Sequence, residues 1–138
     1  MQRDVSPPAG GTPPPATVEL PNGDVLSLIP LAEEVSRRFF LEFPDEQERY
    51  GATGREWCVH DNQWLLSWAV EDLSLGGAHF ANNVRWLAGI LRARDYPVER
   101  LSRDLELAGE VADDRGPELR ELAEKLRSGA ALLARRAR

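Results

Sequence analysis

The sequence predicts an all-α protein, a compact bundle of about five helices. Apolar residues recur at every third or fourth position in successive segments of the chain, which is the period of an amphipathic helix. Prolines and glycines stand mainly between these segments, where they begin or end helices. At 138 residues the chain fits one domain. We therefore expect a single helical bundle domain over residues 30–138.

Two short segments precede this domain. Residues 1–16 contain five prolines and two adjacent glycines but few apolar side chains, so they are predicted to form a disordered extension. Residues 17–29 carry apolar side chains on both sides of Asn22-Gly23, which is a turn signal. Because an isolated hairpin is only marginally stable, we expect an extended arm lying on the helices, or a small hairpin.

Proline and glycine separate the first helical segments. A first helix has Pro30 in its first turn, an apolar residue at every fourth position, and an end at Pro44. An acidic helical turn over 44–51 is expected to be broken by Gly51 and Gly54. A long central helix begins there and ends before a pair of glycines.

The central helix has two faces to bury. One face holds three of the four tryptophans, which are Trp57, Trp64 and Trp68. Cys58 lies on nearly the opposite side, among aliphatic residues. A third helix over about 79–94 repeats this pattern. Its second stripe consists of His79, Trp86 and Ile90. Both helices are therefore expected to lie in the interior of the bundle or to meet a further partner.

Two more helices complete the predicted bundle. One begins at Pro97 and the other near Pro117, and both carry apolar stripes with spacings of three and four. Gly129 occupies the stripe of the last helix, where glycine costs about 1 kcal/mol of helix propensity relative to alanine. We expect it to permit a close approach of another backbone.

Composition limits the classes of function. The net charge is -6 and 42% of the residues are apolar, so nothing attracts the chain generally to nucleic acid. We find no apolar segment long enough to span a membrane and no apolar leader. The single Cys58 cannot form an intramolecular disulfide, and arginine far exceeds the lone Lys125. These features predict a cytoplasmic bacterial protein with no nucleic-acid or membrane partner.

Familiar catalytic signatures are absent from the sequence. It contains no phosphate-binding Gly-rich loop ending in Lys-Ser or Lys-Thr, no His-Glu-x-x-His and no Gly-x-Ser-x-Gly. Cys58 and His60 point about 200° apart on a helix, so they do not form a catalytic dyad. We predict no catalytic residue and no metal site, and we expect Cys58 to be a buried packing residue.

The tryptophan stripes are the predicted site. Indole rings supply much of the binding energy at protein interfaces. We therefore expect two neighbouring helices to form a face that contacts a protein partner or a second copy of the chain, as in a homodimer, or that lines a ligand pocket. Its predicted residues are Trp57, His60, Trp64, Trp68, Glu71, His79, Trp86 and Ile90.

Two alternatives use the histidines of this face. A planar cofactor, either haem or a corrinoid, could lie between the tryptophan stripes with His60 or His79 as its axial ligand. The pair His60-Asp61 is also similar to the phospho-accepting histidine and acid of sensor-kinase dimerisation helices, which indicates a bundle for histidine phosphotransfer.

Two residue patterns extend over about 30–112. The pattern Gly-Arg-x-x-Cys-x-x-Asp is matched by Gly54, Arg55, Cys58 and Asp61. The pattern Phe-x-x-x-Val-x-Trp-Leu-x-x-x-Leu-x-Ala-Arg-x-x-Pro is matched by Phe80, Val84, Trp86, Leu87, Leu91, Ala93, Arg94 and Pro97. Together they resemble a small helical domain of actinobacterial-type proteins. Similar domains look like regulatory or sensory input modules beside cobalamin-binding or stress-signalling domains, so the resemblance implies a regulatory role.

These observations predict a non-enzymatic regulatory or adaptor module that acts through protein contacts. Arg55 is expected to brace the start of the central helix by pairing with Asp61 or Glu48. Arg55, Cys58 and Asp61 are thus predicted to have structural roles.

Overall fold

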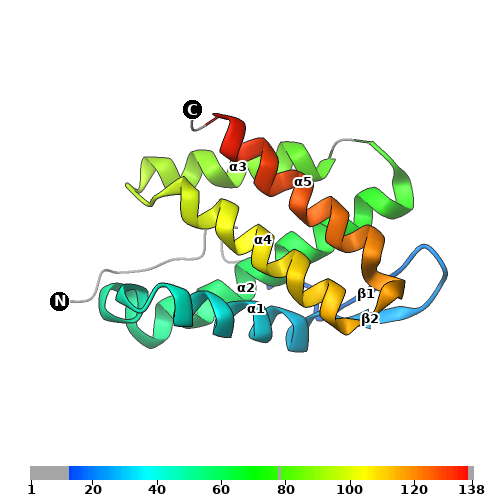
Figure 1. The fold of residues 1–138 in the computed structure, drawn as a ribbon, viewed down its shortest axis with the longest axis horizontal. Helices are drawn as coiled ribbons and strands as arrows, with labels where there is room; N and C mark the ends of the chain where they lie inside the picture. The colour runs from blue at the N-terminus through cyan, green and yellow to red at the C-terminus, as the bar shows by residue number, and fades with distance from the viewer. Residues whose placement is uncertain (1–12, 78, 137–138) are drawn as a thin grey trace.

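The computed structural model describes residues 13–77 and 79–136. In this part of the chain, five α-helices and one two-stranded hairpin form the fold, which confirms the all-α prediction. Figure 1 shows the hairpin at one end of the bundle, with the helices packed along one another. None of the helices in the described ranges is both long enough and apolar enough to cross a membrane.

The hairpin is the first element of the fold. β1 (Thr17–Glu19) pairs antiparallel with β2 (Val25–Ser27), and Val18 lies opposite Leu26. Gly23 has a φ of 93° in the turn, a conformation that glycine adopts without a steric penalty. The segment forms the hairpin and also lies on the helices as expected, with Leu20 and Leu26 buried in the core.

The predicted extension over 1–16 lies mostly outside the described residues, but its last residues are attached to the bundle. The Pro15 carbonyl accepts a hydrogen bond from Gln63 Nε2 at 3.1 Å. The Ala16 carbonyl accepts one from the Leu28 N–H at 2.8 Å. These two hydrogen bonds attach the end of the predicted extension to the bundle, because both carbonyls find a donor there.

α1 (Leu28–Glu42) and α4 (Val98–Arg115) lie side by side, as Figure 1 shows. Each buries an apolar stripe in the common core. Ion pairs join their exposed edges, Arg38 with Asp114 at 2.8 Å and Arg103 with Glu42 at 2.7 Å. Exposed pairs of this kind contribute little stability individually, so the apolar stripes hold the two helices together.

α2 (Asp45–Leu75) joins the predicted acidic turn and the central helix into one long element. It kinks at Gly51, where φ is 62° and ψ is -155°. Gly54, in contrast to the prediction, lies within the helix and does not break it. A Cβ atom on Gly54 would lie 2.2 Å from Tyr50 Cβ, so the missing side chain allows Tyr50 to fold back across the kink.

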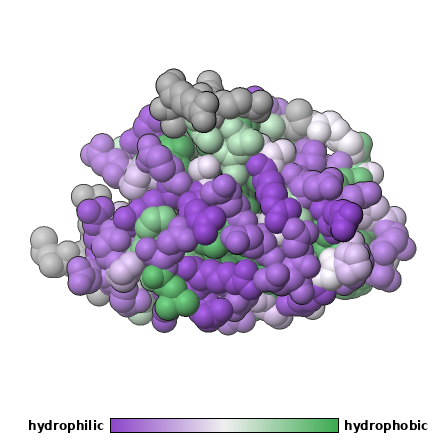
Figure 2. All heavy atoms as spheres, in the orientation of Figure 1, coloured by the Kyte–Doolittle hydropathy of each residue, from purple (hydrophilic) through white to green (hydrophobic). Residues whose placement is uncertain are grey.

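α3 (His79–Ala93) runs back along α2, and α5 (Arg120–Arg136) packs against α4 after a 3-10 turn at Pro117–Leu119. The contact between α4 and α5 is the most extensive in the bundle. Figure 2 shows a mainly hydrophilic surface on the face that these two helices present. Their apolar stripes therefore point inward, as the spacing predicted.

Phe80 connects three helices. Its backbone N–H donates to Asp72 Oδ2 at 2.9 Å, which satisfies one of the N–H groups at the start of α3. Phe80 is 1% exposed, and a Cβ atom on Gly129 of α5 would lie 2.8 Å from its Cε2. The close approach expected at Gly129 is therefore made by an aromatic side chain rather than by a backbone.

Replacing Gly129 with alanine is expected to lower the free energy of unfolding by about 1–3 kcal/mol, because the buried Phe80 ring has to move. Gly89→Ala is the matched control, since an added Cβ on the exposed Gly89 meets no atom within 4 Å. That control should gain up to about 1 kcal/mol from helix propensity. Urea unfolding followed by circular dichroism measures both, and equal effects would contradict the packing role of Gly129.

Candidate functional site

The structure divides the predicted tryptophan face between two places. Trp64 and Trp68 stack with ring centroids 5.9 Å apart, and Trp68 meets Trp86 of α3 edge-on at 6.3 Å. We call Trp64, Trp68 and Trp86 the tryptophan cluster. It reaches the surface, because Trp86 is 49% exposed. Trp57 contacts His60 instead, at 5.3 Å between centroids, and lines a separate cavity.

Neither histidine lines that cavity. His79 is the exposed first residue of α3, whereas His60 lies on α2 and is partly buried. Glu71 is exposed and Ile90 is partly buried, and neither of them lines the cavity. The predicted axial ligand of a haem or corrinoid, His60 or His79, is therefore not part of the wall of this cavity. Asp61 does line it, so the His60-Asp61 pair does not share one environment.

A partly open cavity of about 380 Å³ lies among α1, α2, α3 and α4. Much of its wall is aromatic, with Phe39, Phe40, Tyr50, Trp57 and Tyr96. Polar groups also reach it, namely Glu46, Cys58, Asp61, Asn62, Arg94, Arg100 and Asp104. Three of these are acidic residues, an unusual content for the interior of a bundle because burial disfavours charge.

Asn62 joins three helices at the cavity. Its Nδ2 donates to the Cys58 carbonyl at 3.0 Å, to Asp104 Oδ1 at 3.2 Å and to Ser36 Oγ at 3.4 Å. These acceptors fix the orientation of the amide. Asn62 Oδ1 is then left buried without a hydrogen-bond partner in the described residues. Such an acceptor requires an explanation, because leaving one unsatisfied costs about 1–3 kcal/mol.

The two carboxyl groups beside Asn62 have strongly raised pKa values. Burial raises the pKa of Asp104 to about 7, against the opposing effect of the hydrogen bond from Asn62. Burial also raises the pKa of Asp61 to about 8, the charge of Asp104 adds to this effect, and Arg94 opposes it. Both groups therefore change charge near neutral pH.

Cys58 packs against the core and also lines the cavity. Burial raises the pKa of its thiol well above the usual range, so the thiol is protonated at neutral pH and is a weak nucleophile. Contrary to the expectation, Arg55 pairs with neither Asp61 nor Glu48. Its guanidinium lies over the Phe40 ring at 5.2 Å, and both Phe40 and Asp61 line the cavity.

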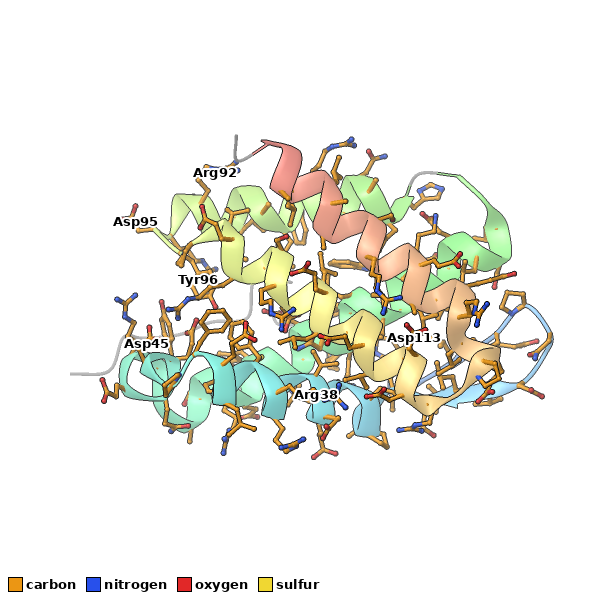
Figure 3. All side chains as sticks on the ribbon, viewed as in Figure 1. Arg38, Asp45, Arg92, Asp95, Tyr96 and Asp113 are labelled. Atoms are coloured by element: carbon orange, nitrogen blue, oxygen red, sulfur yellow. The ribbon has the colours of Figure 1, made fainter. Side chains whose placement is uncertain are left out.

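A hydrogen-bonded group bounds one end of the cavity. The Tyr96 hydroxyl donates to Glu46 Oε1 at 2.5 Å, and Arg100 Nη1 donates to the same oxygen at 3.0 Å. Arg100 also pairs with Asp45 at 2.9 Å. Figure 3 shows Tyr96 between the α3–α4 connection and the start of α2, where Asp45 lies. Burial, together with Glu46, raises the pKa of Tyr96, so its hydroxyl stays a donor.

Asn62 and Asp104 were not identified from the sequence. Each of them nevertheless interrupts an apolar stripe, Asn62 one turn after Cys58 and Asp104 one turn before Ala108. A polar residue on the core face of a helix is a detectable signal, because burial without a partner is costly. The signal indicates that each side chain has a buried partner, but not that they are partners of each other.

Comparison of the chain with protein-family models, with curated proteins and with solved structures gives no match in any of the three. The resemblance suggested by the two residue patterns therefore stays a prediction. In the ranges that the structure describes, no group of three or more His, Cys, Asp or Glu side chains is placed to hold a metal ion. What the fold and the site define is a helical bundle with an acidic, aromatic cavity.

The raised pKa of Asp61 predicts a pH dependence of stability. The folded state holds this proton more tightly than the unfolded state, in which the pKa is about 4, so stability falls as pH rises from about 4 to about 8. Asp61→Asn cannot ionise. It is expected to exceed the wild-type stability at about pH 9 by on the order of 2 kcal/mol or more.

Urea unfolding at several pH values between about 5 and 9 measures this difference. Glu34→Gln is the control, because hydrogen bonds from Arg37 and Arg38 lower the pKa of Glu34 to about 2, below this window. Parallel stability curves for the wild type and Asp61→Asn would show that Asp61 is ionised throughout, contrary to the expectation.

Proposed function

We propose that the chain is a non-enzymatic regulatory module that binds a small organic molecule in the cavity among α1, α2, α3 and α4. The observation that carries this proposal is Asn62 Oδ1, a buried acceptor without a partner in the described residues, on a side chain that lines a cavity. A donor group on a bound molecule would satisfy it.

The composition and size of the cavity support binding of a small molecule. Ligand sites are typically concave, have volumes of roughly 300–1,000 Å³, and combine apolar or aromatic walls with a few polar groups. The cavity here has about 380 Å³, with aromatic rings beside Asp61, Asn62 and Asp104. The polar groups would orient the ligand, and the rings would bury its apolar part.

Binding is better supported than catalysis. Carboxyl groups with pKa values near neutrality also occur in active sites, so the carboxyl groups alone do not decide between the two. The Cys58 thiol is held protonated, and neither histidine lines the cavity to activate it. Asp104 is already engaged by Asn62, which favours a positioning role in binding.

A ligand of this cavity should stabilise the folded protein, because the four helices that form the site come together only in the folded state. A ligand at a hundred times its Kd adds about 2.7 kcal/mol. A chemically diverse library of small molecules, tested by thermal unfolding and ligand-observed NMR, is expected to contain compounds that raise the Tm by several degrees.

Two tryptophan substitutions locate such binding. Leu91 lines the cavity, so Leu91→Trp is expected to fill it and abolish binding. Leu41 is 70% exposed on α1, so Leu41→Trp should leave binding unchanged. Circular dichroism verifies that both variants fold. A library without binders would refute a ligand site in the cavity. Compounds that bind equally well to the two variants would refute it too.

A second candidate function is self-association through the tryptophan cluster. It is favoured by the 49% exposure of Trp86 beside two stacked indoles, since exposed aromatic rings are enriched at interfaces. The function would then be that of an adaptor acting through protein contacts.

Sedimentation velocity over a range of protein concentrations tests this candidate. Trp86→Ala is expected to shift a dimer toward monomer while the helical content is kept, because the ring is half-exposed. Leu75→Ala is the matched control, since Leu75 is 72% exposed and does not belong to the cluster. A wild-type chain that stays monomeric at high micromolar concentration would contradict self-association.

A further inference from the structure

The hydrogen-bonding groups still available in the cavity are mainly acceptors. Asp61 and Asp104 contribute carboxyl oxygens. Asn62 also lines the cavity, and its Oδ1 is a buried acceptor without a partner in the described residues. The donors are largely engaged. Asn62 Nδ2 binds Cys58 and Asp104, while the Tyr96 hydroxyl and Arg100 both bind Glu46. A complementary ligand must therefore bring donors of its own.

The charges at the cavity favour a cation over an anion. Arg100 is neutralised by Asp45 and Glu46, at 2.9 Å and 3.0 Å. Arg94 is exposed but also lines the cavity, and its effect on the pKa of Asp61 is smaller than the effects of burial and of Asp104. Asp61 and Asp104 are left as the acidic pair on the inner wall.

The aromatic wall suits both a cation and an apolar body. Trp57, Tyr50 and Phe40 line the cavity beside the acidic pair. Aromatic faces attract cations through the ring quadrupole. Phe40 already does so with the guanidinium of Arg55 at 5.2 Å. Each of these rings can also cover the aliphatic or aromatic part of a ligand.

We propose that the cavity binds a primary amine in its ammonium form, with the ammonium donating to Asp61, Asp104 and Asn62 Oδ1 and an apolar body packed against the aromatic wall. An ammonium group carries three N–H donors and no acceptor, which matches this set of acceptors. The inference rests on the proposed function and names the class of its ligand.

Binding of an ammonium group is coupled to proton release. The raised pKa values of Asp61 and Asp104 leave both carboxyl groups partly protonated near neutral pH, and a bound cation favours their ionised forms. Cys58 and Tyr96 have raised pKa values and stay neutral in this range, and the arginines keep a fixed charge. The remaining titratable groups at the cavity wall are Tyr50 and Glu46, and Glu46 accepts hydrogen bonds from Tyr96 and Arg100. Affinity should therefore rise with pH between about 6 and 9.

Matched series of probes test the ligand class on the full chain. The amines are propylamine, phenethylamine and tryptamine. Each is compared with the alcohol and the carboxylic acid that replace its amino group. Isothermal titration calorimetry in two buffers of different ionisation enthalpy reports affinity and proton release together. At least one amine is expected to bind about tenfold or more tightly than its alcohol and acid, with protons released.

Variants connect this preference to the acidic pair. Asp61→Asn and Asp104→Asn keep the size of each side chain but remove its charge, so each should weaken amine binding about tenfold or more and reduce proton release. Glu121→Gln, on the exposed surface of α5, should have no effect. Equal amine affinity in the wild type and both variants would overturn the inference.

The outcomes also separate this inference from the proposed function. If an alcohol or an acid binds as tightly as its amine, the amine class is overturned. If Leu91→Trp also abolishes that binding, a ligand site in the cavity is still supported. Failure of every probe and of the diverse library would overturn both.

Discussion

The hydrogen bonds of the Asn62 amide are the constraint on which the rest of the site depends. They reach Ser36 of α1 and Asp104 of α4 from a side chain on α2, so three helices meet at one buried polar group. An apolar residue there would permit closer packing of the helices, but an amide and a carboxyl group need partners and keep their spacing. The cavity lies beside this junction, and the Asn62 Oδ1 atom is buried there without a partner in the described residues.

The fold was predictable because its signals are local. Each helix has an apolar stripe with a period of 3.6 residues. Prolines or glycines lie at or near most of the boundaries between the helices. The tryptophan face was only partly predictable, since spacing on one helix does not tell which residue of the next helix lies opposite. Trp64 and Trp68 are placed to meet Trp86. Trp57 lies two turns before Trp64 on α2. It lines the cavity together with Tyr96 instead of joining the tryptophan cluster.

The cavity itself depends on contacts between residues far apart in sequence. Asn62 and Asp104 are separated by 42 positions, and nothing along the chain pairs them before the helices pack. Glu46 and Arg100 are likewise separated by 54 positions, and each one alone has the pattern of a solvated surface charge. Sequence patterns can indicate that such residues are unusual for their stripe. Only the relative position of α2 and α4 makes them a site.

Both proposed surfaces are carried by α2, and this limits how they can influence each other. Leu65 lines the cavity and Trp68 belongs to the tryptophan cluster, and residues three apart are neighbours on a helix. Trp68 also packs against the core. A ligand that shifted α2 against α4 would therefore move the tryptophan cluster as well. Coupling of this kind requires two arrangements of α2 that differ in their affinity for the ligand. The backbone of α2 is kinked at Gly51, so a change of angle at this residue would distinguish two such arrangements.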